Sequence, residues 1–188
     1  MAVELTRVRF NVTDYHRMID AGILSEDDAL ELIDGEIVAM SPVGAHHSGT
    51  VKKLNRLLMQ TLGNDAIIGV QDPIRLADDT EPEPDLSVLV PRSDFYTKSI
   101  PVPAEILLLI EVADTSLLAD RLVKIPRYAT AAIPEVWLVD LDNNRIERHN
   151  SPRAGVYRDV VVVGPGQVMA SSVVPGVILS ADQILGSG

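Results

Sequence analysis

The chain of 188 residues contains no cysteine, so disulfide bonds and thiolate chemistry are excluded. This composition fits a reducing compartment, and we expect a cytoplasmic protein. The longest unbroken apolar stretch is the five residues from Ile106 to Ile110. That is far short of the roughly 20 residues that a membrane span needs, so no membrane partner is expected. The first residues, Met1 to Arg7, lack a basic flank followed by an apolar core, which argues against a secretory signal.

Motifs that would point to other kinds of chemistry are also missing. The sequence has no Gly-rich phosphate loop, no His-Glu-x-x-His motif and no nucleophile elbow. His46 and His47 lack further imidazole or thiolate partners at zinc-ligand spacing. Aromatic residues make up only 4% of the chain. We expect Tyr128 and Trp137 to be core and helix-packing residues, because two aromatics do not make a stacking platform for bases.

Basic residues are outnumbered, and the formal net charge of −11 argues against tight binding to nucleic acid, since affinity for a phosphate backbone comes from lysine and arginine. The distribution is uneven. Residues 1–120 carry nine basic and 21 acidic side chains, whereas residues 121–158 carry seven basic and four acidic ones. We therefore expect weak, strongly salt-dependent binding to any nucleic-acid partner.

The residues that are present suffice for one domain over positions 1–188, with 46% hydrophobic and 23% charged residues. Asp34-Gly35 between two short apolar stretches predicts a hairpin, and Thr13 is a candidate cap for a short helix before it. Expected helices cover residues 13–18, 46–62, 116–131 and 180–185, and expected strands cover 29–33, 36–40, 66–70, 73–76, 86–90, 106–112, 136–139, 145–149 and 156–163.

The helix expected over residues 116–131 contains a proline and also shows a regular spacing of polar residues. Pro126 lies in its middle and should kink or shorten it. Asp120, Lys124 and Tyr128 recur at four-residue spacing and so share one face of the helix. The order of elements predicts an α/β or α+β fold, in which a mixed sheet is flanked by helices and preceded by an N-terminal helix and hairpin.

Two carboxylates occupy positions where a soluble fold rarely places them. Asp85 opens the apolar stretch Leu86 to Val90, and Glu111 ends the stretch Ile106 to Ile110. A carboxylate beside a central strand is costly to desolvate unless it meets a cation, a donor or a metal, and two on adjacent strands repel each other. A divalent ion would answer both problems, and oxygen ligands suit Mg²⁺ or Mn²⁺. The alternatives are a solvated aspartate at the entry to a strand and, for Lys124, an ordinary surface lysine.

This arrangement resembles the PD-(D/E)XK nuclease superfamily, whose motif is Pro-Asp, an acidic residue on the next strand and then a lysine. Pro84-Asp85 and Glu111-Val112-Ala113 match the motif, but Ala113 stands where the lysine usually lies. The chain is similar to a branch in which the lysine has moved to the following helix, the Uma-type restriction-endonuclease-like proteins, long filed as a domain of unknown function. Lys124 would be that lysine.

The resemblance covers roughly residues 12–165 and includes the stretches 111–116 and 133–140. In the amino-terminal half, the stretch Glu31 to Glu36 and His47 match the same family. The resemblance implies a restriction-endonuclease-like fold. It also places Glu31 beside the metal, and it gives His47 a role as a contact to substrate phosphate or as an auxiliary base. Solvated positions are the alternatives for both residues. Gln71 could lie near the edge of the site, but we expect it to have no role.

The hypothesis is a Mg²⁺- or Mn²⁺-dependent endonuclease that hydrolyses phosphodiester bonds of nucleic acid, with DNA as the expected substrate. Asp85, Glu111 and the backbone carbonyl of Val112 would hold the metal, with Glu31 acting through water. Lys124 would orient the attacking water and offset charge in the transition state. A catalytically silent module of the same fold and a phosphohydrolase of small nucleotides remain alternatives, and a homodimer is left open as the oligomeric state.

Overall fold

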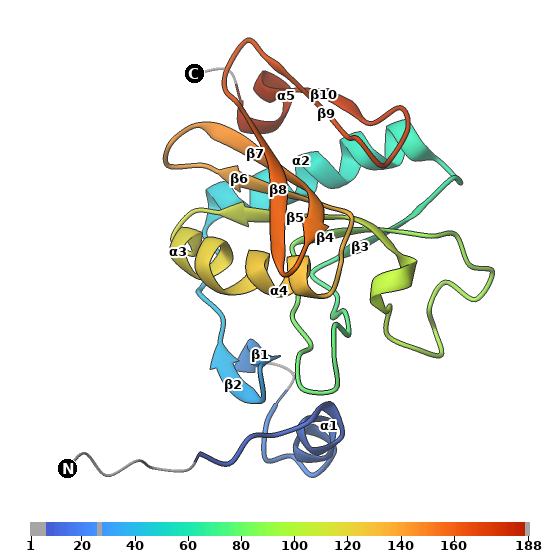
Figure 1. Cartoon of the computed structure of the whole chain (residues 1–188), viewed down its shortest axis with the longest axis vertical. Coiled ribbons are helices and arrows are strands. Elements are labelled where there is room, and N and C mark those ends of the chain that lie inside the picture. The colour runs from blue at the N-terminus through green and yellow to red at the C-terminus, as the bar shows by residue number, and fades with distance from the viewer. Residues whose placement is uncertain (1–6, 26–27, 187–188) are drawn as a thin grey trace.

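The computed structural model describes residues 7–25 and 28–186, and within them a sheet of six strands forms the centre of the molecule (Figure 1). The strands follow the order β3-β4-β5-β6-β7-β8, and all neighbours are antiparallel except β5 and β6, which run parallel. The sheet is therefore mixed, as the sequence predicts. Its strands are β3 (Ile67–Val70), β4 (Leu86–Leu89), β5 (Ile106–Ala113), β6 (Glu135–Asp140), β7 (Arg145–Arg153) and β8 (Val156–Val163).

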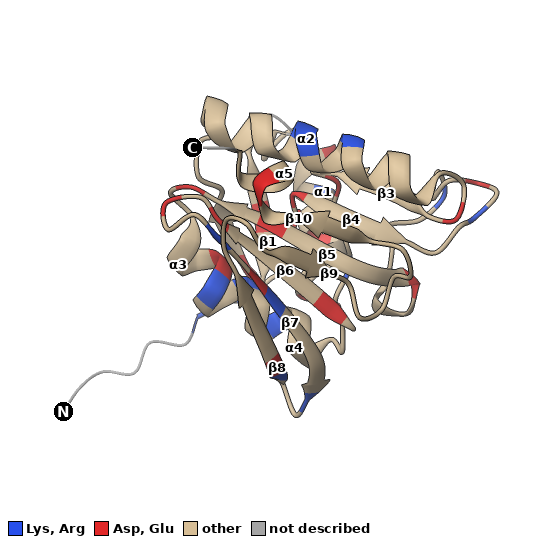
Figure 2. Cartoon of the chain, turned by 90° about the horizontal axis from the view of Figure 1, so that it is seen from above, with Lys and Arg blue, Asp and Glu red and all other residues tan. Residues whose placement is uncertain are grey.

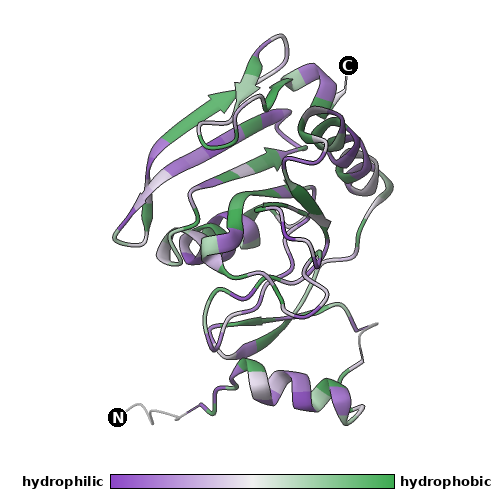
Figure 3. Ribbon diagram, turned by 90° about the vertical axis from the view of Figure 1, so that its right-hand side faces the viewer, coloured by the Kyte–Doolittle hydropathy of each residue, from purple (hydrophilic) through white to green (hydrophobic). Residues whose placement is uncertain are grey.

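Helices cover both faces of this sheet, and Figure 3 shows both hydrophobic and hydrophilic stretches among its strands. Leu54 and Leu58 of α2 pack with α5 on one face, whereas Ile125 and Tyr128 of α4 pack on the other. Strands β4 and β5 are buried on both faces, which explains their nearly continuous apolar sequences. The helical segments are α1 (Val12–Asp20), α2 (Ala45–Leu62), the 3₁₀ turn η2 (Pro103–Glu105), α3 (Leu117–Ala119), the π-helical turn η3 (Asp120–Lys124), α4 (Ile125–Thr130) and α5 (Ala181–Leu185).

The connection from β5 to β6 differs from the predicted single helix over residues 116–131. Parallel strands need a crossover, which is built here from α3, η3 and α4. In η3 the N–H of Ile125 bonds to the carbonyl of Asp120, so the helix is widened just before Pro126. The proline has no N–H to donate to an α-helical ladder, and the widened turn accommodates this. Such π-turns recur at functional sites, and this one carries Lys124.

The predicted hairpin is confirmed as β1 (Leu30–Ile33) and β2 (Glu36–Ala39). Both turn residues have positive φ angles, 49° at Asp34 and 75° at Gly35, as a two-residue hairpin turn of type I′ requires. A Cβ on Gly35 would also lie 2.7 Å from the Cβ of Arg9. The glycine is therefore required both by the turn and by the segment packed against it.

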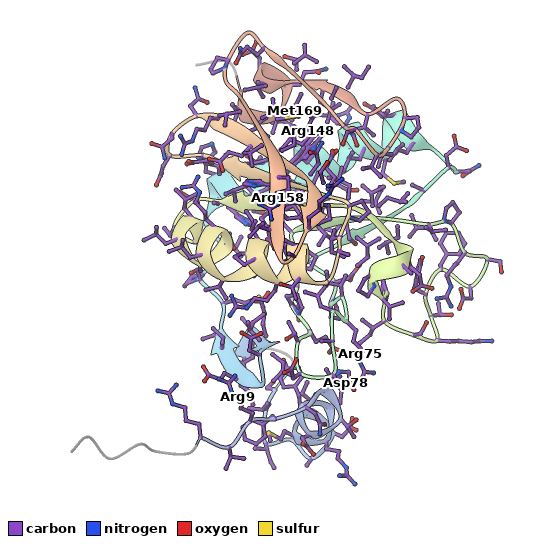
Figure 4. All side chains as sticks on the ribbon, viewed as in Figure 1. Arg9, Arg75, Asp78, Arg148, Arg158 and Met169 are labelled. Atoms are coloured by element: carbon purple, nitrogen blue, oxygen red, sulfur yellow. The ribbon has the colours of Figure 1, made fainter. Side chains whose placement is uncertain are left out.

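The amino-terminal helix α1 packs beside the hairpin at one end of the molecule (Figure 1). Asn11 caps α1 by accepting from the N–H of Asp14, which corrects the expectation that Thr13 is the cap. The N–H of Val12 bonds to the carbonyl of Asp78, whose side chain pairs with Arg75 next to α1 (Figure 4). The loop before β4 therefore anchors this part of the chain.

One strand prediction is wrong and one pair of strands was not predicted, and all of these segments are short. Residues 73–76 form no strand in the sheet, because Pro73 cannot donate and the N–H groups of Ile74, Arg75 and Leu76 bond to three separate carbonyls, of Pro82, Pro101 and Thr80, rather than to one neighbouring strand. The strands β9 (Val168–Ala170) and β10 (Ile178–Ser180) were not predicted, because three residues are too few to show the alternation of apolar and polar residues that identifies a strand.

Two other expectations concern location. No helix within the described ranges is long and apolar enough to cross a membrane. The amino-terminal stretch Met1 to Arg7, which argues against a secretory signal, lies outside the described residues apart from Arg7. The expectation of a cytoplasmic protein therefore stays a prediction.

Candidate active site

A cavity of about 400 Å³ lies where the hairpin, the segment between β2 and α2, and the ends of β4, β5 and η3 meet. Its two walls differ in chemistry. Residues 38–44, which run from the end of β2 to the start of α2, supply a mostly apolar wall, and the strands and η3 supply a charged one. The ionisable side chains that line it in the described part of the chain are Glu31, Glu83, Asp85, Glu111, Asp114, Asp120, His47 and Lys124.

Asp85 reaches the cavity because of the register between β4 and β5. Leu86, the first residue of β4, pairs with Ile110, so Asp85 just before it lies opposite Glu111. The Asp85 side chain is nearly buried, and Oδ2 accepts hydrogen bonds from His47 Nε2 at 3.0 Å and from the Val112 N–H at 2.8 Å. A carboxylate at the entry to a strand thus becomes a fixed part of the site rather than a solvated residue.

Glu111 is buried at the same end of β5. Its Oε1 accepts a hydrogen bond from the hydroxyl of Tyr128 and lies 3.5 Å from Lys124 Nζ. Burial raises the pKa of Glu111 well above its ordinary value; Lys124 opposes this effect, whereas Asp120 and Asp85 add to it. The site therefore holds a carboxyl group that needs more positive charge than the described residues supply.

Lys124 joins the two sides of the cavity. Its Nζ lies 2.7 Å from Glu31 Oε1 and 3.5 Å from Glu111 Oε1, and it donates to the carbonyl of Glu83 at 3.2 Å. Burial alone would lower the pKa of Lys124, but the negative charges of Glu111 and Glu31 outweigh it, and the pKa lies above the ordinary value. The lysine therefore stays positively charged at neutral pH.

Glu31 and His47 are also placed at this cavity, from elements distant in sequence. Glu31 is buried on β1, where Oε1 accepts both Lys124 and the N–H of Glu83 at 2.8 Å. His47 lies in the first turn of α2, and the hydrogen bond to Asp85 raises its pKa. Its Nδ1 is buried and has no hydrogen-bond partner among the described residues. In this arrangement the imidazole contacts Asp85.

Several site residues were not identified from the sequence. Tyr128 was expected to pack in the core, and it does, but its hydroxyl also contacts Glu111. Gln71 was expected to have no role, yet its Nε2 donates to Asp85 Oδ1 at 3.3 Å. Asp120 and Tyr128 could have been recognised as site residues because each lies four positions from Lys124. Glu83 could have been recognised because it lies two positions before Asp85. Nothing local indicates Gln71, which is positioned by a backbone φ angle of 55°.

The donor set fits a divalent cation. Asp85 and Glu111 face the same cavity, and Mg²⁺ is commonly held by one or two carboxylates with water completing its shell. A cation there would supply the positive charge that the buried Glu111 requires. Among the residues that the structure describes, no three His, Cys, Asp or Glu side chains form a closed metal site. Water or the carbonyl of Val112 would therefore have to complete the coordination.

The basic residues of the segment 121–158 are mostly engaged elsewhere. Arg121, the cation next in sequence to the site, points away from it and pairs with Glu147 at 2.5 Å and with Asp140 at 3.7 Å. Of the seven cations in this segment, five have carboxylate partners in the described structure: Arg121, Lys124, Arg127, Arg145 and Arg148. Most of the positive charge of this segment is therefore paired with carboxylates and does not form a free basic surface.

Comparisons with known proteins show the family and the fold of this chain. Residues 12–182 match the sequence model of a family described as "Uma2: Putative restriction endonuclease". The fold is similar to a crystal structure described as that of a putative nuclease belonging to DUF820 from Anabaena variabilis ATCC 29413. The TM-score is 0.71 at 15% sequence identity, over 94% of this chain and 97% of the other. At that identity the likeness shows the fold, which confirms the predicted fold class. No curated protein matches the chain at a significant level.

Proposed function

Because this chain belongs to the Uma2 family of restriction-endonuclease-like proteins, we propose that it is a nuclease that hydrolyses phosphodiester bonds of nucleic acid, with DNA as the expected substrate and Mg²⁺ or Mn²⁺ as its cofactor. The observation that carries the proposal is the meeting of Asp85, Glu111 and Lys124 at one cavity. They come from two strands and a helical turn that are separated in sequence. Folding alone does not require this cluster, because buried charges are costly to desolvate.

The carboxylates have the role of holding the cation. Asp85 and Glu111 would bind it, with the Val112 carbonyl as a further ligand. A bound divalent ion would polarise a phosphoryl oxygen and lower the pKa of a coordinated water. The hydrogen bonds from His47, Gln71 and the Val112 N–H fix the orientation of Asp85, so little reorganisation is needed when a cation binds. We assign His47 to this positioning role.

Lys124 has an electrostatic role. Since its pKa lies above the ordinary value, it does not accept a proton from water at neutral pH and cannot serve as the general base. A protonated amine beside the carboxylates can donate hydrogen bonds to a scissile phosphate and offset the charge that develops on it. Glu31 makes the shorter of the two carboxylate contacts of this amine, and Glu111 makes the longer one.

The two alternatives predict different behaviour. A catalytically silent module would not need the contacts of Lys124 with both Glu31 and Glu111, because buried ion pairs contribute little to the stability of the fold. A phosphohydrolase of small nucleotides would share the same cluster, so the substrate must separate it from a nuclease.

The test is a comparison of substrates with the purified wild-type protein in millimolar Mn²⁺ or Mg²⁺, with an excess of EDTA as the metal-free control. Supercoiled plasmid, linear duplex, single-stranded DNA and a dinucleotide are each incubated and resolved by electrophoresis or chromatography. A nuclease cuts at least one of the polymers, and only with metal. Turnover of the dinucleotide alone would establish the small-nucleotide alternative, and no turnover of any substrate would support the silent module.

A further inference from the structure

A long segment of this acidic chain contains no acidic residue. Between Glu36 and Asp65, none of the 28 residues is Asp or Glu, although the whole chain has 27 acidic residues in 188. The segment forms most of β2, the apolar wall of the cavity and all of α2. It carries three of the basic residues, Lys52, Lys53 and Arg56, all on α2. This is a local reversal of charge in a protein whose net charge is −11.

The helix α2 presents these cations to solvent. Its inner side buries Leu54 and Leu58 against the sheet, which leaves Lys52, Lys53 and Arg56 on the outer side. Figure 2 shows blue residues and no red ones along α2. No ion pair involves Lys52 or Arg56 in the described part of the protein, whereas Lys53 donates to the carbonyl of Ile184 at 3.1 Å. The two free cations lie one helical turn apart.

The same helix leads directly to the candidate active site. Its first turn contains His47, which lines the cavity, and Val43 and Gly44 just before it line the apolar wall. Lys52 follows His47 by five residues in the same helix, so the free cations and the cavity lining share α2.

We propose that the outer side of α2 is the docking surface for the sugar–phosphate backbone of the nucleic acid, with Lys52 and Arg56 as its phosphate contacts. The inference rests on the proposed nuclease function and names where its substrate is held. It also differs from the expectation drawn from the sequence, in which the excess of basic residues lies at 121–158. In the structure five of those seven cations have carboxylate partners, whereas Lys52 and Arg56 of α2 have none among the described residues.

Nucleic acid is a better fit to this surface than an anionic membrane. A helix that binds in a membrane interface needs an apolar side to insert next to its basic one. The apolar side of α2 is buried in the core, and Met59 is the large apolar side chain exposed on this helix in the described structure. Exposed cations on a helix whose apolar side is buried match a phosphate backbone, which is bound by charge neutralisation.

A matched pair of charge reversals tests the proposal. In Lys52→Glu/Arg56→Glu, two cations of α2 are reversed. In the control Arg153→Glu/Arg158→Glu, the same change in net charge is made on the β7–β8 hairpin, on the opposite side of the molecule from α2 (Figures 2 and 4). Binding of a fluorescent duplex and of a single strand is measured by anisotropy in EDTA over a range of salt concentrations. Circular dichroism and thermal melting check that each variant is folded.

We expect the α2 variant to bind duplex at least about tenfold more weakly than the wild type. The slope of its log affinity against log salt concentration should also become shallower by about 2, since each phosphate contact contributes about 0.9 to that slope. The control should keep the salt slope of the wild type. If reversal prevents folding, the neutral variant Lys52→Gln/Arg56→Gln replaces it, with the same expected change of slope.

Equal losses in the two variants would mean that only net charge matters, and a larger loss in the control would place binding on the β7–β8 hairpin; either result overturns the proposal. Preferential binding of the wild type to anionic phosphatidylserine vesicles over DNA would overturn it as well. These failures are separate from failure of the proposed function, because a wild-type protein that cuts DNA with metal remains a nuclease whichever surface binds its substrate.

Discussion

Lys124 and Glu31 form the shortest contact that the site lysine makes with a carboxylate, 2.7 Å between Nζ and Oε1. Glu31 belongs to the amino-terminal hairpin, whereas Lys124 belongs to the π-helical turn after β5. The same oxygen of Glu31 accepts the N–H of Glu83, so the hairpin is tied both to the lysine and to the segment that leads to Asp85. The hairpin is therefore a structural part of the candidate active site.

We predict that Glu31→Gln lowers the rate of DNA cleavage by about tenfold or more, the lower range for an electrostatic contact in an active site. The amide still accepts the N–H of Glu83, so the hairpin should stay in place, but the lysine loses its closest negative partner. The control is Glu36→Gln on the same hairpin, whose exposed side chain pairs with Arg7 and Arg9. Equal rates in Glu31→Gln and the wild type would remove Glu31 from the mechanism.

We predict that Tyr128→Phe weakens Mn²⁺ binding, because the hydroxyl that orients Glu111 is lost. The free energy of unfolding should fall by about 1–2 kcal/mol, as for loss of one buried hydrogen bond. Tyr157→Phe is the matched control, since that hydroxyl donates to the carbonyl of Ile133 at 2.9 Å, outside the site. The control should lose stability but keep its affinity for Mn²⁺ in isothermal titration. A similar loss of affinity in both variants would show that Tyr128 acts only on stability.

The raised pKa of Glu111 predicts how stability depends on pH. A carboxyl group whose pKa is higher in the folded state stabilises the protein below its unfolded pKa of about 4.3, and that stabilisation is lost as the pH rises through the folded pKa. The melting temperature of the metal-free wild type should therefore fall, relative to that of Glu111→Gln, as the pH rises above about 4.3.

Metal binding requires the ionised carboxylate, so the increase in melting temperature caused by Mn²⁺ should grow over the same pH range. The increase should be much smaller in Glu111→Gln at every pH. Parallel pH profiles of the two metal-free proteins would contradict the assignment of a raised pKa to this residue.

We predict that Lys124→Ala remains folded and still binds Mn²⁺, but cleaves DNA about 10² times more slowly or worse, as expected for loss of one preorganised electrostatic contact. Arg121 cannot take over the role, because it is held by Glu147 and Asp140. Lys98→Ala, at an exposed loop lysine, is the control. Adding Ala113→Lys to Lys124→Ala restores a lysine at the usual motif position and should recover part of the rate. Full activity in Lys124→Ala would exclude the lysine from the chemistry.

The sequence predicted those features that depend on local signals. The Asp34-Gly35 turn has a strict backbone requirement, and the hairpin followed from it. Asp85 and Glu111 were recognisable because charged residues at the ends of apolar strands are unusual, and the register of β4 and β5 places them opposite each other. Lys124 followed from the resemblance, since nothing in its own helix distinguishes it from a surface lysine.

Features that depend on contacts distant in sequence were not predictable. The hydroxyl of Tyr128 and the amide of Gln71 reach the carboxylates only because the chain folds back on itself. The π-helical turn before Pro126 reconciles a proline with a helix in a way that propensities do not encode. Counts of charge place the excess of basic residues at 121–158, but counting cannot show which of these cations are paired with carboxylates in the fold.

The measurement that tests the central claim most directly is the rate of plasmid cleavage in Mn²⁺ by the wild type and by Asp85→Asn. The asparagine keeps the size of the side chain and can still accept the N–H of Val112, so folding should be preserved. We predict metal-dependent cleavage by the wild type, and loss of both the cleavage and the Mn²⁺-induced rise in melting temperature in Asp85→Asn. Equal cleavage by the two proteins, or cleavage by the wild type that persists in EDTA, would contradict a metal-dependent nuclease site at this cavity.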